Sequence, residues 1–240
     1  MKKKILWGRY ERMRPDEIEA VFDVYPIAYL PWGASEYHGV HNPIGLDSIK
    51  AYGMSLDLAK SVGGLVLPVI HQASSTIKTY PGVDFKRHSL EFSEELIRMM
   101  CREYFEQLVD EGFKIVVLLT GHCGEPHFEI LKSVAEEFNK KYTDRHFWTL
   151  AEFEVLEADM LVANHSAIGE TALQLYYAPE MVALEKLPAD RETTLEDDAV
   201  SGADPRPATA EMGKTIVETF VKNAGRKMDQ LIEQYIKNEV

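Results

Sequence analysis

A run of five apolar residues at 115–119 constrains the fold of this chain more than any other feature. It reads Ile-Val-Val-Leu-Leu, with no polar residue to face solvent. Such a run is typical of a strand buried on both faces, as in a parallel sheet. Strand-like runs also occur at 27–30, 65–70 and 147–150, and helical patterns separate them. This alternation predicts an α/β fold, a three-layer α/β/α sandwich with a mostly parallel sheet.

Five helices are expected between and after these strands, at 47–62, 89–111, 130–139, 169–177 and 208–236. Ser89 or Ser93 could cap the second helix, and Gly112 should end it. Gly225 is a candidate break in the last helix. The acidic segment 189–207 carries two prolines, so we expect an irregular surface loop there. No linker divides the 240 residues, which predicts a single domain over 1–240.

The charge and the cysteine content limit the partners and the compartment. A net charge of -13 argues against a nucleic-acid partner, because phosphate binding needs clustered Lys and Arg. No apolar run approaches the roughly 20 residues that span a bilayer, so no membrane partner is expected. Cys101 and Cys123 cannot form a disulfide framework, which indicates a reducing compartment. We therefore predict a cytoplasmic protein.

The segment 36–47 holds two carboxylates and two imidazoles just after the strand expected at 27–30. The four side chains are Glu36, His38, His41 and Asp47. Glycine and proline interrupt the segment, which predicts a loop, and open α/β sheets bind ligands beyond the carboxyl ends of their strands. Carboxylates and imidazoles together are ligands for divalent metals such as zinc and manganese. The alternative is a set of ordinary surface residues.

Two further clusters carry the same residue types. His122 and Glu125 directly follow the strand expected at 115–119, and His165 and Glu170 lie at the start of the helix expected at 169–177. Each has a simpler explanation, because His122 could be a turn residue and Glu170 a favourable charge at a helix start. If the strands are parallel, His122 and the first loop lie at the same edge of the sheet. That common location favours a metal site.

The order of these motifs resembles the creatininase family of metal-dependent amidohydrolases. The similarity rests on Gly-Ala-Ser-Glu-Tyr-His-Gly at 33–39, Asn-Pro-Ile-Gly-Leu-Asp at 42–47, Thr-Gly-His-Cys-Gly-Glu at 120–125, His-Ser-Ala-Ile-Gly-Glu-Thr at 165–171 and Gly-Ala-Asp-Pro at 202–205. Departures from the family pattern, at positions 37, 46, 123 and 125, surround the metal-ligand positions and remove none of them. The resemblance therefore implies that the hydrolytic centre is kept and that the substrate differs from creatinine.

The resemblance also implies the site residues. The metal ligands would be Glu36, His38, Asp47, His122 and Glu170, with Asp47 bridging two divalent ions and Glu125 in reserve for Glu170. Zinc, manganese and iron all accept such ligands. His165 matches a family histidine that moves protons at the leaving group, and Glu125 is a second catalytic candidate. Tyr37, Tyr80 and Trp148 are candidates for substrate binding, and a homo-oligomer such as a hexamer is expected.

The activity implied is hydrolysis of a carbon–nitrogen bond in a small, cyclic amide or formamide by a metal-activated hydroxide. Three alternatives stay open on the sequence. The first is hydrolytic ring opening of a cyclic ketone, as in inositol-type sugar catabolism, and the second is a non-catalytic metal-binding scaffold. The third is a hydrolase that uses Cys123 as its nucleophile.

Overall fold

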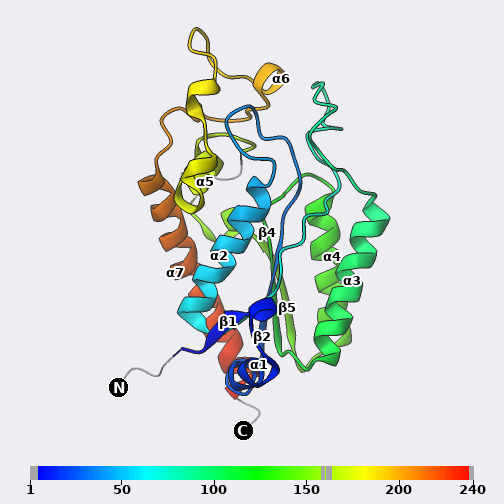
Figure 1. Cartoon of the computed structure of the whole chain (residues 1–240). Helices are drawn as coiled ribbons and strands as arrows, with labels where there is room; N and C mark the ends of the chain where they lie inside the picture. Colours follow the sequence, from blue (N-terminus) through cyan, green and yellow to red (C-terminus); the bar gives the residue numbers. More distant parts are fainter. Residues whose placement is uncertain (1–4, 158–159, 161–163, 238–240) are drawn as a thin grey trace.

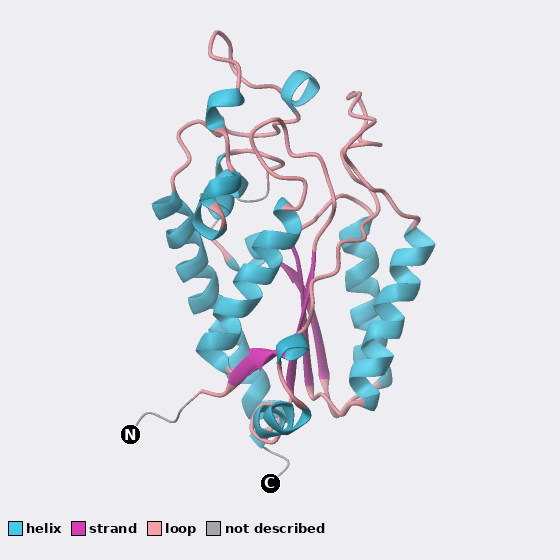
Figure 2. Cartoon of the chain, in the orientation of Figure 1, coloured by secondary structure: helices cyan, strands magenta, loops and turns pink. Residues whose placement is uncertain are grey.

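A five-stranded parallel sheet forms the centre of the chain. The computed structural model describes residues 5–157, 160 and 164–237. The strands are β1 (Trp7–Arg9), β2 (Ile27–Trp32), β3 (Gly64–Val66), β4 (Ile115–Thr120) and β5 (His146–Ala151), in the order β1-β3-β2-β4-β5. Each pair of neighbouring strands is parallel. Helices cover both faces of the sheet, which confirms the predicted α/β sandwich (Figures 1 and 2).

Two layers of helices enclose the sheet. One layer contains α3 (Glu94–Asp110) and α4 (His127–Lys141), and the other contains α2 (Leu46–Val62), α5 (Ile168–Tyr177) and α7 (Ala210–Tyr235) (Figure 1). The shorter elements are η1 (Tyr10–Arg12), α1 (Pro15–Phe22), η2 (Glu152–Val155), η3 (Pro179–Met181), η4 (Leu184–Lys186) and α6 (Leu195–Asp198). No helix among residues 5–157, 160 and 164–237 is long and apolar enough to cross a bilayer.

The central strand β4 supplies both cores. Ile115, Val117 and Leu119 pack in the core beneath α2, α5 and α7. Val116 and Leu118 pack in the opposite core beneath α3 and α4. Successive side chains of a strand point to opposite faces, so a strand covered on both sides needs apolar residues at every position. The continuous apolar run is explained by this double burial.

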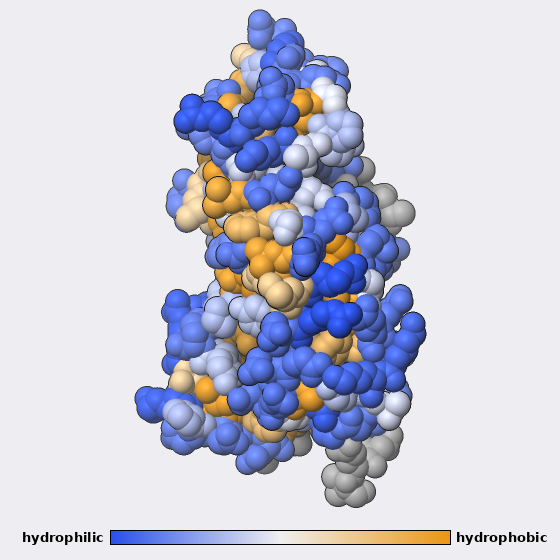
Figure 3. Space-filling model, turned by 90° about the vertical axis from the view of Figure 1, so that its right-hand side faces the viewer, coloured by the Kyte–Doolittle hydropathy of each residue, from blue (hydrophilic) through white to orange (hydrophobic). Residues whose placement is uncertain are grey.

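The helix α3 has a buried apolar face and an exposed face that also carries some apolar residues. Ile97 and Phe105 of α3 are fully buried, whereas Met99 and Tyr104 of the same helix are exposed. Figure 3 turns this side of the molecule toward the viewer and shows apolar surface gathered across its middle, between more hydrophilic ends. The helix thus directs one stripe of side chains to the sheet and a mixed surface to solvent.

Several elements differ from those expected, and three of the differences have a clear physical reason or consequence. The strand expected at 65–70 ends at Val66, and beyond Pro68 only an isolated bridge between Trp32 and Ile70 continues the pairing. Proline has no amide hydrogen for a ladder, which explains the early end. The helix expected from residue 89 begins at Glu94, because Ser93 accepts the amide of Leu96 at 3.2 Å. The last helix continues through position 225 without a break.

All five strands run the same way, so the segments that follow them leave from one edge of the sheet, at the top of Figure 1. The first turn of α2 lies against the end of β4 at this edge. A Cβ atom at Gly121 would lie 2.1 Å from the carbonyl oxygen of Asp47, so only glycine permits this approach. The contact brings the loop after β2 and the loop after β4 together.

We predict opposite effects for alanine at two glycines. Gly121→Ala should lower the free energy of unfolding by roughly 1–3 kcal/mol, because the new methyl group would overlap the backbone of Asp47. Gly225→Ala should raise it by roughly 0.5–1 kcal/mol, because Gly225 lies within α7 and has open space around it. Urea unfolding followed by circular dichroism measures both. A Gly121→Ala variant as stable as the wild type would contradict the close approach.

Candidate metal centre

A cavity of about 220 Å³ lies beyond the carboxyl ends of the strands. Its lining includes five of the carboxylates and imidazoles selected from the sequence, which are Glu36, Asp47, His122, His165 and Glu170. His38 is fully buried directly beside them. These six residues come from the loop after β2, the start of α2, the loop after β4 and the start of α5. The fold therefore brings the three sequence clusters together.

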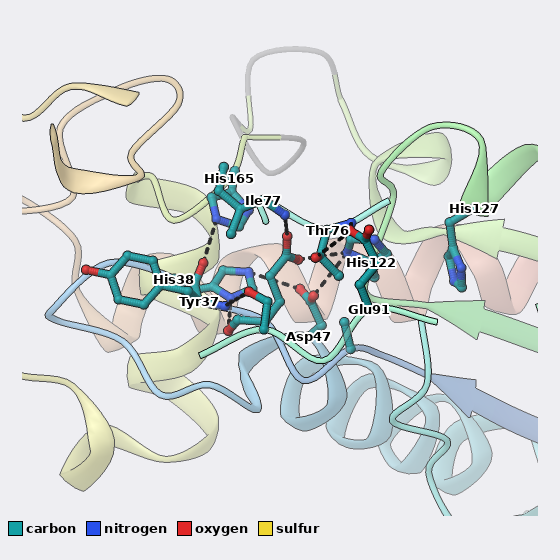
Figure 4. A network of polar contacts seen from close by, with 12 residues as sticks. Tyr37, His38, Asp47, Thr76, Ile77, Glu91, His122, His127 and His165 are labelled. Carbon is teal, nitrogen blue, oxygen red and sulfur yellow. Dashed lines mark hydrogen bonds and ion pairs between the residues drawn. The ribbon is translucent and has the colours of Figure 1, made fainter. Parts of the chain in front are cut away.

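Asp47 lies at the centre of the cluster and faces two imidazoles with its two oxygens. Its Oδ1 is 3.3 Å from Nε2 of His38, and its Oδ2 is 3.4 Å from Nδ1 of His122 (Figure 4). Asp47 is 1% exposed. A carboxylate with its oxygens directed to different ligand groups can bridge two ions.

Backbone carbonyls determine the tautomers of both imidazoles. Nδ1 of His38 is 3.0 Å from the carbonyl oxygen of Glu36, and Nε2 of His122 is 3.0 Å from that of Ser74. Because a carbonyl can only accept, the neutral forms carry their protons on those nitrogens. The opposite nitrogens then direct lone pairs at the carboxylates of the cluster. Such an arrangement suits a cation placed between nitrogen and oxygen ligands.

Glu36 and Glu170 complete the carboxylate set. Oε1 of Glu36 accepts the amide of Ile77, and its Oε2 lies 2.9 Å from Nδ1 of His122. Glu170 lies in the first turn of α5, where its Oε2 accepts the amide of Ser166 at 2.6 Å and lies 3.6 Å from Nε2 of His38. Each glutamate is thus held by a backbone amide and still faces an imidazole.

Three groups of side chains in the described part of the chain could hold a metal ion, each with its ligand atoms within 4.8 Å of one another. They are Glu36/Asp47/His122, His38/Asp47/Glu170 and Glu36/His38/His165. The first two share Asp47 and together contain all five ligands expected from the sequence. Several buried atoms of these groups, including Nε2 of His38 and Oδ2 of Asp47, have no hydrogen-bond partner. This donor set fits two divalent ions that accept nitrogen and oxygen ligands.

The pKa values of the two imidazoles reflect the concentrated negative charge. Burial by itself lowers the pKa of His38, but Asp47, Glu170 and Glu36 outweigh burial and raise it to about 9. The same opposition of burial and carboxylates raises the pKa of His122 well above its ordinary value. Conversely, burial raises the pKa of Asp47, but the neighbouring histidines and Lys50 bring it well below its usual range. Without a metal, protons provide the positive charge that these carboxylates require.

His165 occupies a different position from the other imidazoles. Its ring stacks on His38, with 4.3 Å between the centroids, and its Nε2 is 3.0 Å from the carbonyl oxygen of Tyr37 (Figure 4). Burial and the neighbouring His38 lower its pKa. A neutral His165 therefore carries its proton on Nε2 and has a lone pair on Nδ1, and it lines the cavity. It can accept a proton there.

The remaining candidates from the sequence lie in different environments. Tyr80 lines the cavity and is 52% exposed. Tyr37 is outside the lining, and its ring packs on Phe85 with 5.1 Å between centroids. Trp148 packs against the core beneath α7. Glu125 is exposed and belongs to none of the three metal-binding groups.

Sequence reasoning missed Lys50 and Glu152, which both line the cavity. Nζ of Lys50 donates to Oε1 of Glu152 at 2.8 Å and to Oε1 of Glu170 at 2.6 Å. Two signals could have revealed them. Lys50 is one helical turn after Asp47, a spacing that puts both on one side of α2. Glu152 directly follows β5, at the same sheet edge as the other ligands.

A buried histidine next to the centre predicts acid sensitivity. Nε2 of His41 lies 3.1 Å from the carbonyl oxygen of Ser166, and burial lowers the pKa of His41 to about 4. In the unfolded chain its pKa is near 6.5. The unfolded state therefore binds more protons between pH 6.5 and 4, and His41 removes up to roughly 3 kcal/mol of stability as the pH falls through this range.

His41→Gln should reduce this loss of stability relative to the wild type. Chemical denaturation at pH 7, 5.5 and 4.5 measures the free energy of unfolding of both proteins. Other buried histidines titrate in both proteins, so the difference between the two pH profiles isolates residue 41. Parallel profiles would contradict a neutral, buried His41.

The model of the family Creatininase, described as creatinine amidohydrolase, matches residues 11–228. This chain therefore belongs to the creatininase family, and the resemblance inferred from the motifs is confirmed. No curated protein matches the chain in the corresponding search.

Solved structures show the same fold. A creatinine amidohydrolase (creatininase) aligns with a TM-score of 0.76 and 19% identity, over 95% of this chain and 98% of its own. The structure named Creatininase Mn aligns with a TM-score of 0.76 and 18% identity, over 97% and 100% of the two chains. A mutant creatininase of Zn-Zn type aligns with a TM-score of 0.74 and 18% identity, over 98% and 100%. These similarities confirm the architecture over nearly the whole length of this chain and of each aligned structure.

Proposed function

We propose that this protein is a metal-dependent hydrolase that cleaves a carbon–nitrogen bond in a small, cyclic amide or formamide, with two divalent ions as cofactors. The observation that carries the proposal is Asp47, whose two oxygens face imidazoles of two different ligand groups. Membership of the creatininase family supports the type of reaction. Relatives named for Mn and for Zn-Zn support the type of ion.

Glu36, Asp47 and His122 would hold one ion, and His38, Asp47 and Glu170 would hold the other. Bound there, divalent ions supply Lewis acidity toward a carbonyl oxygen and lower the pKa of water. The protein contributes orientation, because backbone groups hold both imidazoles and both glutamates. The volume of about 220 Å³ lies below the range of about 300–1,000 Å³ typical of drug-sized ligands, which favours a small substrate.

His165 would move the proton that amide cleavage requires. Hydrolysis must deliver a proton to the departing nitrogen, and Nδ1 of His165 has a lone pair available at the cavity. The carbonyl oxygen of Tyr37 anchors Nε2, so the ring keeps its orientation while Nδ1 accepts and releases the proton. In this proposal Glu125 has no catalytic role, because it is exposed and outside the cavity lining. A single domain, a cytoplasmic location and a homo-oligomer stay predictions.

We predict that Asp47→Asn removes both ions, because both ligand groups lose a charged member. Elemental analysis should show the metal content falling from about two ions per chain toward none. Turnover should fall by more than about 100-fold, the upper range for changing even an indirect metal partner. Asp57→Asn is the matched control, because Asp57 lies on the same helix and pairs with Lys60 at 2.7 Å, away from the cavity.

A panel of cyclic amides, formamides and cyclic ketones tests the substrate class. Chelator-sensitive hydrolysis of an amide or formamide supports the proposal, and turnover of a cyclic ketone alone would replace it with carbon–carbon cleavage. Metal binding without turnover across the panel would indicate a scaffold. A wild-type protein that binds no zinc, manganese or iron would refute the ligand assignment.

Alkylation distinguishes the metal centre from a cysteine nucleophile. Cys123 lines the cavity, and burial, followed by the charge of Glu152, raises the pKa of its thiol well above the ordinary value. A protonated thiol is a poor nucleophile. We expect iodoacetamide at pH 7 to leave turnover largely unchanged and a chelator to abolish it. Inactivation by iodoacetamide with resistance to the chelator would favour Cys123 as the nucleophile.

A further inference from the structure

A lysine ammonium is built into the candidate metal centre. Lys50 is 2% exposed and is the one Lys or Arg among the described residues that line the cavity. Its Nζ lies 2.6 Å from Oε1 of Glu170, 2.8 Å from Oε1 of Glu152 and 3.9 Å from Oδ1 of Asp47. A buried charge with two short carboxylate contacts is rigidly held. Lys50 therefore adds a permanent positive charge where metal ions would also bind.

The ammonium of Lys50 lies closer to the His38/Asp47/Glu170 group than to the Glu36/Asp47/His122 group. Its ion pairs include Asp47 and Glu170, two members of the His38/Asp47/Glu170 group. The Oδ1 atom that it approaches is the oxygen of Asp47 that faces His38. Within 4 Å, in the part of the chain that the structure describes, Lys50 has no ion pair with Glu36. The Glu36/Asp47/His122 group is therefore the less affected of the two.

Hydrogen bonds to Glu170 add a second constraint on the same group. Lys50 occupies Oε1 of this carboxylate, and the amide of Ser166 occupies one side of Oε2. A carboxylate oxygen has two lone pairs, so Oε2 can still accept an ion on the side that faces His38. Lys50 thus takes one lone pair of Oε1 and part of the negative charge that Glu170 could offer to a metal ion.

We propose that Lys50 makes the two metal subsites unequal, so that Glu36/Asp47/His122 fills first and His38/Asp47/Glu170 binds its ion more weakly. This inference rests on the proposed metal centre. Its cause is repulsion between the ammonium and a divalent ion that share the carboxylates Asp47 and Glu170. Glu152 moderates the repulsion, because it neutralises Lys50 and belongs to none of the three metal-binding groups. Lys50 and Glu152 are positioning residues in this scheme.

Calorimetric titration of the metal-free, full-length protein with zinc chloride tests the inference. The wild type should show two binding steps of different affinity. Lys50→Met should tighten the second step by about tenfold or more, the scale on which residues behind metal ligands act. Glu152→Gln should weaken the second step, because Lys50 then acts on Glu170 and Asp47 without compensation. The first step should change less in both variants.

Lys60→Met is the matched control. Lys60 lies on the same helix and pairs with Asp57 three residues earlier, as Lys50 does with Asp47, but its side chain is 50% exposed. It should leave both binding steps unchanged. Thermal unfolding gives a second readout. Metal-free Lys50→Met should melt below the wild type, because Glu152 and Glu170 lose their cation, and zinc should raise its melting temperature more than that of the wild type.

Three results would overturn the inference. They are an unchanged or weaker second step in Lys50→Met, an unchanged or tighter second step in Glu152→Gln, and equal affinities in the wild type. If Lys50→Met does not fold, the Glu152→Gln titration decides alone. A wild type that binds no zinc refutes the proposed metal centre itself. If the wild type instead binds two zinc ions and the variants leave the ratio of the two affinities unchanged, only the role of Lys50 is refuted.

Discussion

Compensation of buried charge is the constraint on which the rest of this structure depends. Glu36, Asp47 and Glu170 lie with His38 and His122 at the edge of a sheet, removed from water. Ionised groups in such a setting persist only when opposite charges and hydrogen bonds replace the lost hydration. Protons on the imidazoles and the ammonium of Lys50 provide that charge in the metal-free chain. The same carboxylates fit divalent ions. The groups whose burial costs free energy are therefore also the groups that can bind a metal.

The parallel sheet makes this cluster feasible. Its strands end at a common edge, and the segments after β2, β4 and β5 contribute residues that are more than a hundred positions apart. The close approach of Gly121 to the backbone of Asp47 joins the end of β4 to the start of α2. Two separate cores pack against the opposite faces of the sheet below these strand ends. The loops after β2 and β4 and the first turns of α2 and α5 thus carry the site, and the ends of the strands position them.

Sequence reasoning predicted the parts of the fold that have strong periodicity. The strand β4 was recognisable because every one of its residues is buried and all but Thr120 are apolar. The long helices were recognisable because their apolar residues recur at helical spacing. The strand β1 and the helix α1 (Pro15–Phe22) were not predicted, because elements this short do not show a clear hydrophobic period. The strand β1 also pairs with β3, which is distant in the sequence. β3 was predicted too long, because its apolar residues continue beyond the hydrogen-bonded ladder.

The site was predictable to a similar extent. Motif order identified the five residues that the fold brings together. Lys50 and Glu152 belong to no motif, and only the ion pair between them in the folded chain reveals their connection. Trp148 was a candidate for substrate binding, and in the structure its partly buried side chain packs against the core beneath α7. Residue type and order therefore indicate which groups can bind a metal, whereas charge balance around them requires three-dimensional structure.

Each of the three imidazoles at the cavity has one ring nitrogen 3.0 Å from a main-chain oxygen, and these oxygens belong to residues 36, 37 and 74. A peptide carbonyl is present whatever side chain its residue bears. A substitution at position 37 or 74 can therefore change the side chain while the ring that faces its carbonyl keeps its proton on the same nitrogen. The orientation of the three rings is thus inherited with the backbone and is independent of the side chains at positions 37 and 74. A lineage with this scaffold could vary those two side chains without rebuilding the orientation of its imidazoles.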